Sequence, residues 1–149
     1  MTGRPKSSAA ASIIDPSTIQ AYRETEYRVL GEPPLTLQVG QVSAGLLALH
    51  KRHKVDCSAF LTACNPFSQR SGDAANANRQ AALAAELARR GLAFVAGIGK
   101  HPSNDWPGED SFLVLGLDLQ AARMLGVQLE QNGFIWSGAD AVPQLILLR

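Results

Sequence analysis

The chain has 149 residues, 14 Lys and Arg against 13 Asp and Glu, a net charge of +1 and an apolar fraction of 46%. This length suits one domain with a core of its own. The near-neutral charge disfavours a dedicated nucleic-acid-binding protein, which needs a clear basic excess. No apolar run approaches the ~20 residues of a membrane span, so we expect no membrane partner.

The start of the chain differs in composition from the rest. Residues 1–12 are rich in Ser, Ala and Gly and include Arg4 and Lys6. They lack the apolar stretch of about 7–15 residues that a signal peptide requires. We therefore expect a disordered tail over residues 1–14, a single domain over 15–149 and a cytoplasmic location.

A helix and a β-hairpin are expected after this tail. Asp15 followed by Pro16 is a typical N-cap and first helical residue, which predicts a helix over 16–24. Alternating apolar residues predict strands over 26–30 and 35–39. The Gly/Pro-containing segment between them is short enough for a hairpin turn.

The middle of the chain predicts two helices around one buried strand. Ser43 can cap a helix that ends in the basic run 50–54, where cations complement the helix dipole. The strand 58–63 is apolar almost throughout, which is typical of a central position. The longest helix should span 74–90 and end at Gly91 in a C-cap position.

The last third of the chain continues the mixture of strands and helices. It predicts strand 92–98, loop 99–110, strand 111–117, a helix from the N-cap Asp118 to about 130–132, and strands 133–137 and 144–148. Hairpins mixed with crossovers indicate an α+β fold. We expect a single-domain mixed β-sheet with about four helices packed mainly on one face.

Polar residues share one face of the long helix with core residues. At 100° per residue, Asn76, Arg79 and Gln80 lie within about 60° of the direction of Leu83 and Leu87. The two leucines should face the core, so the polar residues should face inward near the N-terminus of the helix. An inward arginine needs an acceptor, because a buried unpaired charge costs several kcal/mol.

The loop 99–110 supplies carboxylates for that arginine. We expect Arg79 to pair with Asp105 or Glu109 and to draw the Trp106 loop over the end of strand 58–63. Two interpretations stay open: the pair only holds the loop, or it lines a pocket for a polar or anionic ligand. The candidate ligand-binding residues are Thr62, Asn65, Asn76, Arg79, Asp105, Trp106, Glu109 and Ser111.

The two cysteines are expected to be reduced and to lie on one strand. Seven steps along a strand place Cys57 and Cys64 roughly 23 Å apart, and the odd separation points them to opposite faces. A disulfide needs Cα atoms within about 7 Å. The same geometry argues against tetrahedral zinc held by these cysteines with His50 and His53, so we expect no metal and no cofactor.

Three further site types have weak support. Gly97-x-Gly99-Lys100 lacks the glycine frame of a phosphate loop. A magnesium site from the carboxylates at 105, 109 and 110 has no confirming spacing. Cys64 with His101 could form a nucleophile and base, but a free buried cysteine is more often structural.

Several of these residues occur in linked motifs. The motifs are Tyr22-Arg23-x3-Tyr27, Phe60-Leu61-Thr62-Ala63-Cys64-Asn65-Pro66, Ser71-x-Asp73-x2-Asn76-x2-Arg79-Gln80, Gly97-x-Gly99, Trp106-x2-Glu109-x-Ser111-Phe112-x-Val114-x-Gly116, and Gln131-Asn132 before Trp136. Together they resemble the bacterial family DUF3293 over about 21–149. This resemblance implies no catalytic role, because the family has no established activity. The family usually has Glu where this chain has Ala75, so no acid/base role is expected there.

Three functions are consistent with these patterns. The first is a cytoplasmic bacterial module that binds a small polar or anionic metabolite. The second is a small hydrolase or transferase that uses Glu109 or Asp105 with Arg79. The third is a protein-interaction scaffold or homo-oligomer formed through the edge of the last strand. The absence of a paired catalytic motif favours the binding module.

Overall fold

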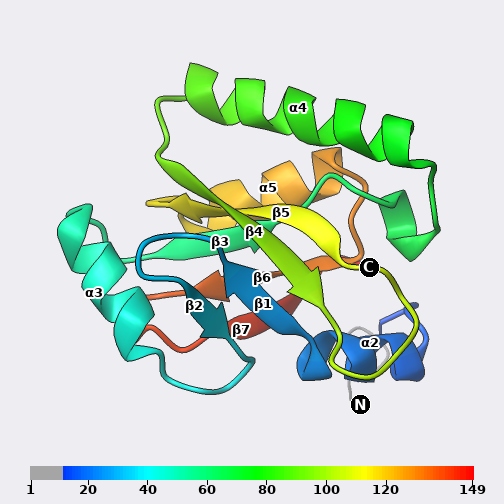
Figure 1. Ribbon diagram of the computed structural model, residues 1–149, viewed down its shortest axis with the longest axis horizontal. Coiled ribbons are helices and arrows are strands. Elements are labelled where there is room, and N and C mark those ends of the chain that lie inside the picture. The colour runs from blue at the N-terminus through cyan, green and yellow to red at the C-terminus, as the bar shows by residue number, and fades with distance from the viewer. Residues whose placement is uncertain (1–11) are drawn as a thin grey trace, which may run out of the picture.

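A seven-stranded sheet forms the middle layer of the computed structural model, which describes residues 12–149 (Figure 1). The strands are β1 (Glu26–Val29), β2 (Leu35–Leu37), β3 (Ser58–Leu61), β4 (Phe94–Lys100), β5 (Glu109–Leu115), β6 (Gly133–Ser137) and β7 (Gln144–Leu147). The helices are α2 (Pro16–Glu24), α3 (Ala44–Arg52), α4 (Asp73–Arg89) and α5 (Leu119–Gln128), with a 3-10 turn η1 (Pro66–Ser68). The predicted single-domain α+β class and the order of its elements are confirmed.

Every neighbouring pair in this sheet is antiparallel, so the prediction of a mixed sheet is wrong. The strand order is β2-β1-β4-β5-β3-β6-β7. The helical crossovers β3-α4-β4 and β5-α5-β6 do join parallel strands, as such connections usually do. In each case, however, an antiparallel strand occupies the place between the two, so no parallel pair forms.

Helices cover both faces of the sheet, which corrects the prediction that they pack mainly on one face. Side chains alternate along β3: Ala59 and Leu61 pack with residues of α4 and α5, whereas Phe60 packs with Leu46 and Leu49 of α3. Helix α2 lies on the face of Phe60, because both line one cavity. The division of the core follows from β3 being buried on both sides.

The predicted helix starts and the long helix are confirmed. Asp15, Ser43 and Asp118 each accept a hydrogen bond from a backbone N–H of the helix they precede, at 2.8, 3.1 and 2.8 Å. Leu83 and Leu87 of α4 are 2% and 0% exposed. After α4, Gly91 adopts φ +73°, the left-handed conformation that favours glycine at a helix end.

The structure describes the last three residues of the expected tail, 12–14. Ile14 is only 7% exposed, and the Ser12 hydroxyl donates to the carbonyl oxygen of Arg149. Ser12 and Ile14 therefore contact the domain, whereas Ile13 is exposed, and the rest of the expected tail, 1–11, lies outside the described residues. No helix within residues 12–149 is long and apolar enough to cross a membrane.

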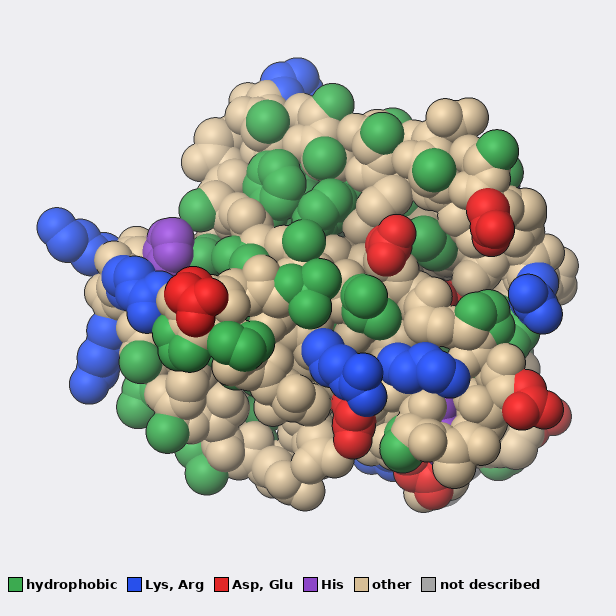
Figure 2. Space-filling view, in the orientation of Figure 1, with side chains coloured by type: hydrophobic (Ala, Val, Ile, Leu, Met, Phe, Trp, Pro, Cys, Tyr) green, Lys and Arg blue, Asp and Glu red, His purple; other side chains and the backbone are tan. Residues whose placement is uncertain are grey.

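Most of the basic run at the end of α3 lies at the surface. Lys51, Arg52, His53 and Lys54 are exposed, and basic side chains project from that edge of the molecule in Figure 2. His50 is the exception, because it is buried and its Nε2 lies 2.8 Å from the Ser58 hydroxyl. One residue of the run, His50, thus belongs to the core, and the other four lie in solvent at the end of the helix.

The Gly97-x-Gly99 motif makes room for aromatic rings rather than for phosphate. Tyr27 and Phe60 pack edge to face over this part of β4, with centroids 5.3 Å apart. A Cβ atom at Gly97 would lie 2.7 Å from the carbonyl oxygen of Arg28 and 2.8 Å from the Phe60 ring. Glycine therefore allows β1 and Phe60 to approach β4 closely.

We predict that Gly97→Ala lowers the free energy of unfolding by about 1–3 kcal/mol, because the added methyl group overpacks against backbone and ring atoms. Gly72→Ala is the control, since no atom lies within 4 Å of the added Cβ there and its φ of −67° suits alanine. The loss of the N-cap preference for glycine is offset by the lower entropy of the unfolded alanine variant, about 0.4–1 kcal/mol, so the net change should be small. Urea unfolding of both variants tests this, and equal losses would contradict the proposed close approach.

Candidate functional site

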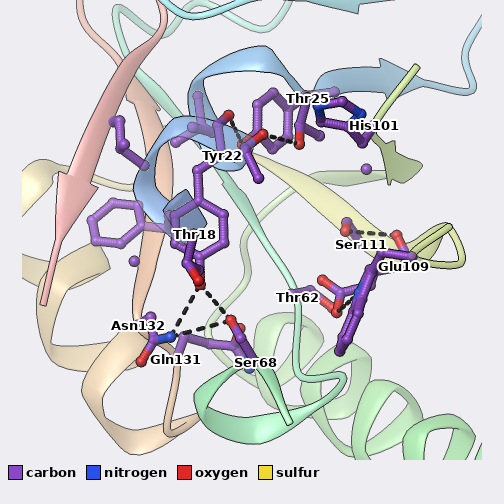
Figure 3. A pocket seen from close by; sticks show the side chains of 18 of the residues that line it. Thr18, Tyr22, Thr25, Thr62, Ser68, His101, Glu109, Ser111, Gln131 and Asn132 are labelled. Atoms are coloured by element: carbon purple, nitrogen blue, oxygen red, sulfur yellow. Dashed lines mark hydrogen bonds between the residues drawn. The ribbon is translucent and has the colours of Figure 1, made fainter. Parts of the chain in front are cut away.

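A cavity of about 370 Å³ lies between α2 and the sheet (Figure 3). Thr18, Tyr22 and Thr25 reach it from α2, and Tyr27 and Phe60 reach it from the sheet. The remaining lining comes from η1, the start of β5, the 101–108 loop, the segment before β6, and residues of β4, β6 and β7. The cavity is within the usual size range of small-molecule sites.

The sheet side of the cavity is largely aromatic. The Tyr27 hydroxyl donates a 2.6 Å hydrogen bond to the backbone carbonyl of Tyr22. The polar end of Tyr27 is therefore already occupied. Burial raises the pKa of Tyr27 well above its ordinary value. Tyr27 and Phe60 thus offer ring surface rather than an ionisable group.

Glu109 is the carboxylate of the cavity. It is the first residue of β5, and strand alternation places it on the same face as Ser111. Asn65 Nδ2 and Trp106 Nε1 both donate to its Oε2 atom, at 2.7 and 3.2 Å. Burial raises the pKa of Glu109, and these two hydrogen bonds offset the increase only in part.

Asn65 holds the loop that follows β3. Its Oδ1 accepts from the backbone N–H of Ser71 and from Asn76 Nδ2, each at 2.9 Å, and its own N–H donates to Asn76 Oδ1 at 2.9 Å. Asn65, Phe67 and Ser68 all have φ between +47° and +58°. Non-glycine residues in this region are uncommon and often occur at functional sites.

A second polar cluster joins three distant parts of the chain. Asn132 Nδ2 donates to the Tyr22 hydroxyl at 3.0 Å and to the Ser68 hydroxyl at 3.2 Å, and the two hydroxyls bond to each other. Arg149 donates to Asn132 Oδ1 at 3.1 Å. Gln131 Nε2 donates to the Cys64 carbonyl at 3.0 Å. The cluster fixes α2 against η1 and the segment before β6.

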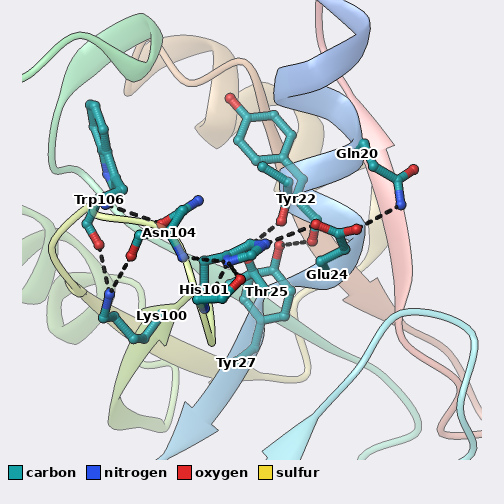
Figure 4. Close-up of polar contacts among 11 residues, drawn as sticks. Gln20, Tyr22, Glu24, Thr25, Tyr27, Lys100, His101, Asn104 and Trp106 are labelled. Carbon is teal, nitrogen blue, oxygen red and sulfur yellow. Dashed lines mark hydrogen bonds and ion pairs between the residues drawn. The ribbon is translucent and has the colours of Figure 1, made fainter.

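His101 attaches the 101–108 loop to α2 (Figure 4). Its Nδ1 accepts from the backbone N–H groups of Ser103 and Asn104, at 3.1 and 3.0 Å. This requires an unprotonated Nδ1, so Nε2 carries the hydrogen and donates to Glu24 at 2.8 Å. That bond is the largest cause of the lowered pKa of Glu24. Both ring nitrogens are therefore already engaged.

The structure brings together most of the predicted site residues. Thr62, Trp106, Glu109 and Ser111 line the cavity. Asn65 and Asn76 lie beside it and position Glu109 through hydrogen bonds. The Trp106 loop does lie beside the end of β3, where the Thr62 hydroxyl donates to the Asp110 carbonyl at 2.6 Å.

Arg79 and Asp105 do not line the cavity. The predicted pairing of Arg79 with Asp105 or Glu109 is wrong. Both residues are exposed, and the hydrogen bond found for Arg79 is a 3.5 Å contact with Asn76. The inward position on this turn of α4 belongs to Gln80, whose Oε1 accepts from the Ala63 N–H at 3.0 Å. The longer arginine side chain reaches water and needs no buried partner.

The cysteines are unpaired, as predicted. They flank β3 rather than lie on it, because the strand ends at Leu61. Burial raises the pKa of the Cys64 thiol, which disfavours the reactive thiolate. Within residues 12–149 there is no cluster of three or more His, Cys, Asp or Glu residues that could hold a metal ion.

Sequence reasoning missed several lining residues. Tyr22, Tyr27, Gln131 and Asn132 were visible in the motifs but received no role. His101 was considered only as the base for Cys64. The motif pattern was a usable signal, whereas the helix α2 that carries Tyr22 gave no sign of facing a cavity.

We predict that Asn65→Ala costs about 2–3 kcal/mol of unfolding free energy, because it leaves buried hydrogen-bonding groups without partners. Arg79→Ala should stay within about 0.5 kcal/mol, as is usual for an exposed side chain. Urea unfolding compares the two. A larger loss for Arg79→Ala than for Asn65→Ala would contradict the contacts described here.

We predict that Glu109→Gln increases stability at neutral pH. The amide oxygen can accept from Asn65 and Trp106, and the buried charge is removed. The folded pKa lies above the ordinary 4.5, so wild-type stability falls as the pH rises through the interval between these values. The advantage of Glu109→Gln should therefore vanish below this interval and be complete above it.

Thermal unfolding between acid and neutral pH measures this advantage. Asp105→Asn is the control, because Asp105 is exposed and lies in the loop just before Glu109. An equal pH-dependent gain in both variants would show that burial of Glu109 is not its cause.

Comparison with known proteins gives one match. No curated protein and no solved structure matches the chain. The family described as "Protein of unknown function (DUF3293)" matches residues 61–133, from the end of β3 to the start of β6. This segment includes Asn65, Trp106 and Glu109 but not Tyr22 or Tyr27, so it is shorter than the expected 21–149. Over these residues, about half of its length, the chain resembles the family DUF3293, as its motifs predicted.

Proposed function

We propose that the protein binds a small polar metabolite in the cavity between α2 and the sheet. The observation that carries this proposal is the Glu109 carboxylate in the wall of that cavity. Glu109 is held by two neutral donors on one oxygen, beside the aromatic side chains Tyr27 and Phe60. A mainly apolar cavity with a few convergent polar groups and a shifted pKa is typical of a binding site.

The charge of the lining argues against the anionic part of the predicted ligand. Among the described residues that line the cavity there is one carboxylate and no Lys or Arg. An anion would face Glu109 without a compensating cation, and like charges at short range repel. The lining therefore favours a polar ligand that carries no negative charge.

An enzyme that uses Glu109 as general acid or base is the second candidate. The raised pKa of Glu109 favours it, since a carboxyl group with a pKa nearer neutrality exchanges protons more effectively. Arg79, the expected partner, and Asp105, the alternative to Glu109, are exposed. Both nitrogens of His101 are engaged. With Glu109 but neither Arg79 nor Asp105 in the cavity, binding is the better-supported function.

The proposal also covers the compartment, the source and the assembly of the protein. Two unpaired cysteines fit a reducing compartment such as the cytoplasm, and the DUF3293 resemblance fits a bacterial source. β7 is an edge strand of the sheet, which leaves a scaffold or homo-oligomer as a third candidate.

We predict that members of a polar fragment collection raise the melting temperature of the wild type and not that of Thr18→Trp. The new indole would occupy the cavity from α2, which has no buried residue whose packing it would disturb. A ligand at about 100 times its Kd should stabilise the wild type by ~2.7 kcal/mol.

Met124→Trp is the matched control, because Met124 is exposed on α5, which packs on the other face of the sheet. It should respond to the fragments as the wild type does. Fragments that stabilise wild type and Thr18→Trp equally would contradict binding in this cavity.

A further inference from the structure

The Glu109 carboxylate has no cationic partner. No ion pair of Glu109 is found within residues 12–149. Its two donors, the Asn65 amide and the Trp106 indole, are neutral, and both bind Oε2. Oε1 has no hydrogen-bond partner among the described side chains and is not among the buried unsatisfied atoms. One oxygen of a lining carboxylate is therefore open to a donor from the cavity.

The basic residues around the site are directed elsewhere. Lys100 Nζ donates to the backbone carbonyl of Trp106 at 2.9 Å (Figure 4). The Arg70 guanidinium lies 5.9 Å from the centre of the Trp106 ring, and His101 bonds to Glu24. Arg79 is exposed. The protein thus keeps a partly buried negative charge without using the cations it has nearby.

The surroundings of Glu109 suit an organic cation better than a metal ion. A metal ion needs several ligands, and the described residues offer no cluster of three candidates. Tyr27, Phe60 and Trp106 instead supply aromatic surface to the same cavity. Aromatic faces and a carboxylate attract an ammonium or amidinium group together, and most strongly when water is excluded.

We infer that the cavity binds an organic cation, with an ammonium or amidinium group against Glu109 Oε1 and an apolar body against Tyr27 and Phe60. This inference rests on the proposed function, because it names the class of ligand for the same cavity. Such a ligand would supply the charge that the protein leaves out. It would also use the open carboxylate oxygen without displacing Asn65 or Trp106.

Three probes of one shape test the charge preference. They are 2-phenylethylamine, 2-phenylethanol and phenylacetate, titrated at pH 7 into the wild type, Glu109→Gln, Thr18→Trp and Asp105→Asn. The NMR signal of the Trp106 indole N–H follows binding, because this group donates to Glu109. Unfolding curves of each variant show that it is folded.

We expect the amine to bind the wild type at least about tenfold more tightly than the alcohol, a difference of ~1.4 kcal/mol. Phenylacetate should bind most weakly, because its carboxylate faces the carboxylate of Glu109. Glu109→Gln should weaken the amine by about tenfold or more and change the alcohol by less than about twofold. Asp105→Asn should leave all three affinities unchanged.

The outcomes separate the inference from the proposed function. If amine and alcohol bind equally and both are lost in Thr18→Trp, the cavity binds ligands but the charge preference is wrong. Unchanged amine affinity in Glu109→Gln also overturns the inference. If no probe and no member of the fragment collection shows binding that Thr18→Trp removes, both the inference and the proposed function fail.

Discussion

The hydrogen bonds of Asn65 are the constraint on which the candidate site depends. Through one side chain and one backbone N–H, this residue joins the end of β3, the first turns of α4 and the first residue of β5. β3 and β5 are neighbours in the sheet, so the backbone hydrogen bonds between them fix their distance and Asn65 fixes the adjoining loop. The position of Glu109 follows from both.

The left-handed backbone of this loop is part of the same arrangement. Asn tolerates positive φ better than most residues because its short side chain can hydrogen-bond locally, and Asn65 does so. Phe67 and Ser68 have no such advantage, yet the Phe67 N–H donates to the Glu130 carbonyl at 2.7 Å and Ser68 bonds to Asn132. Contacts to the segment between α5 and β6 therefore hold a strained turn beside the cavity.

Under the proposed function, Glu109 lowers the stability of the fold while it serves ligand binding. A partly buried carboxylate with only neutral partners makes the folded protein less stable than a neutral isostere would, since desolvation disfavours its charge. Proteins commonly tolerate such a cost at sites where a ligand supplies the missing interaction. The cost and the open oxygen have the same origin, because both arise from the absence of a cationic partner.

Local sequence signals predicted the elements well. The caps Asp15, Ser43 and Asp118, and Gly91 after α4, act through backbone groups a few residues away, so a short window contains their cause. The leucines of α4 were also predictable, because helical periodicity identifies a buried face. Periodicity did not distinguish Arg79 from Gln80, since both lie near the edge of that face and only the neighbouring Ala63 N–H selects Gln80.

The sequence by itself thus determined the helices, the strands and the α+β class, together with the polar residues Thr62, Asn65, Trp106 and Glu109 of the site. Tertiary structure alone decided that an antiparallel strand fills the gap in each crossover, which makes the sheet antiparallel. It placed α4 and α5 on one face and α3 on the other. It also decided that Tyr22 of α2 meets Ser68 and Asn132, which are 46 and 110 residues away in the chain. The physical reason is that caps and periodicity act over a few residues, whereas strand order and cavity walls depend on contacts between distant segments.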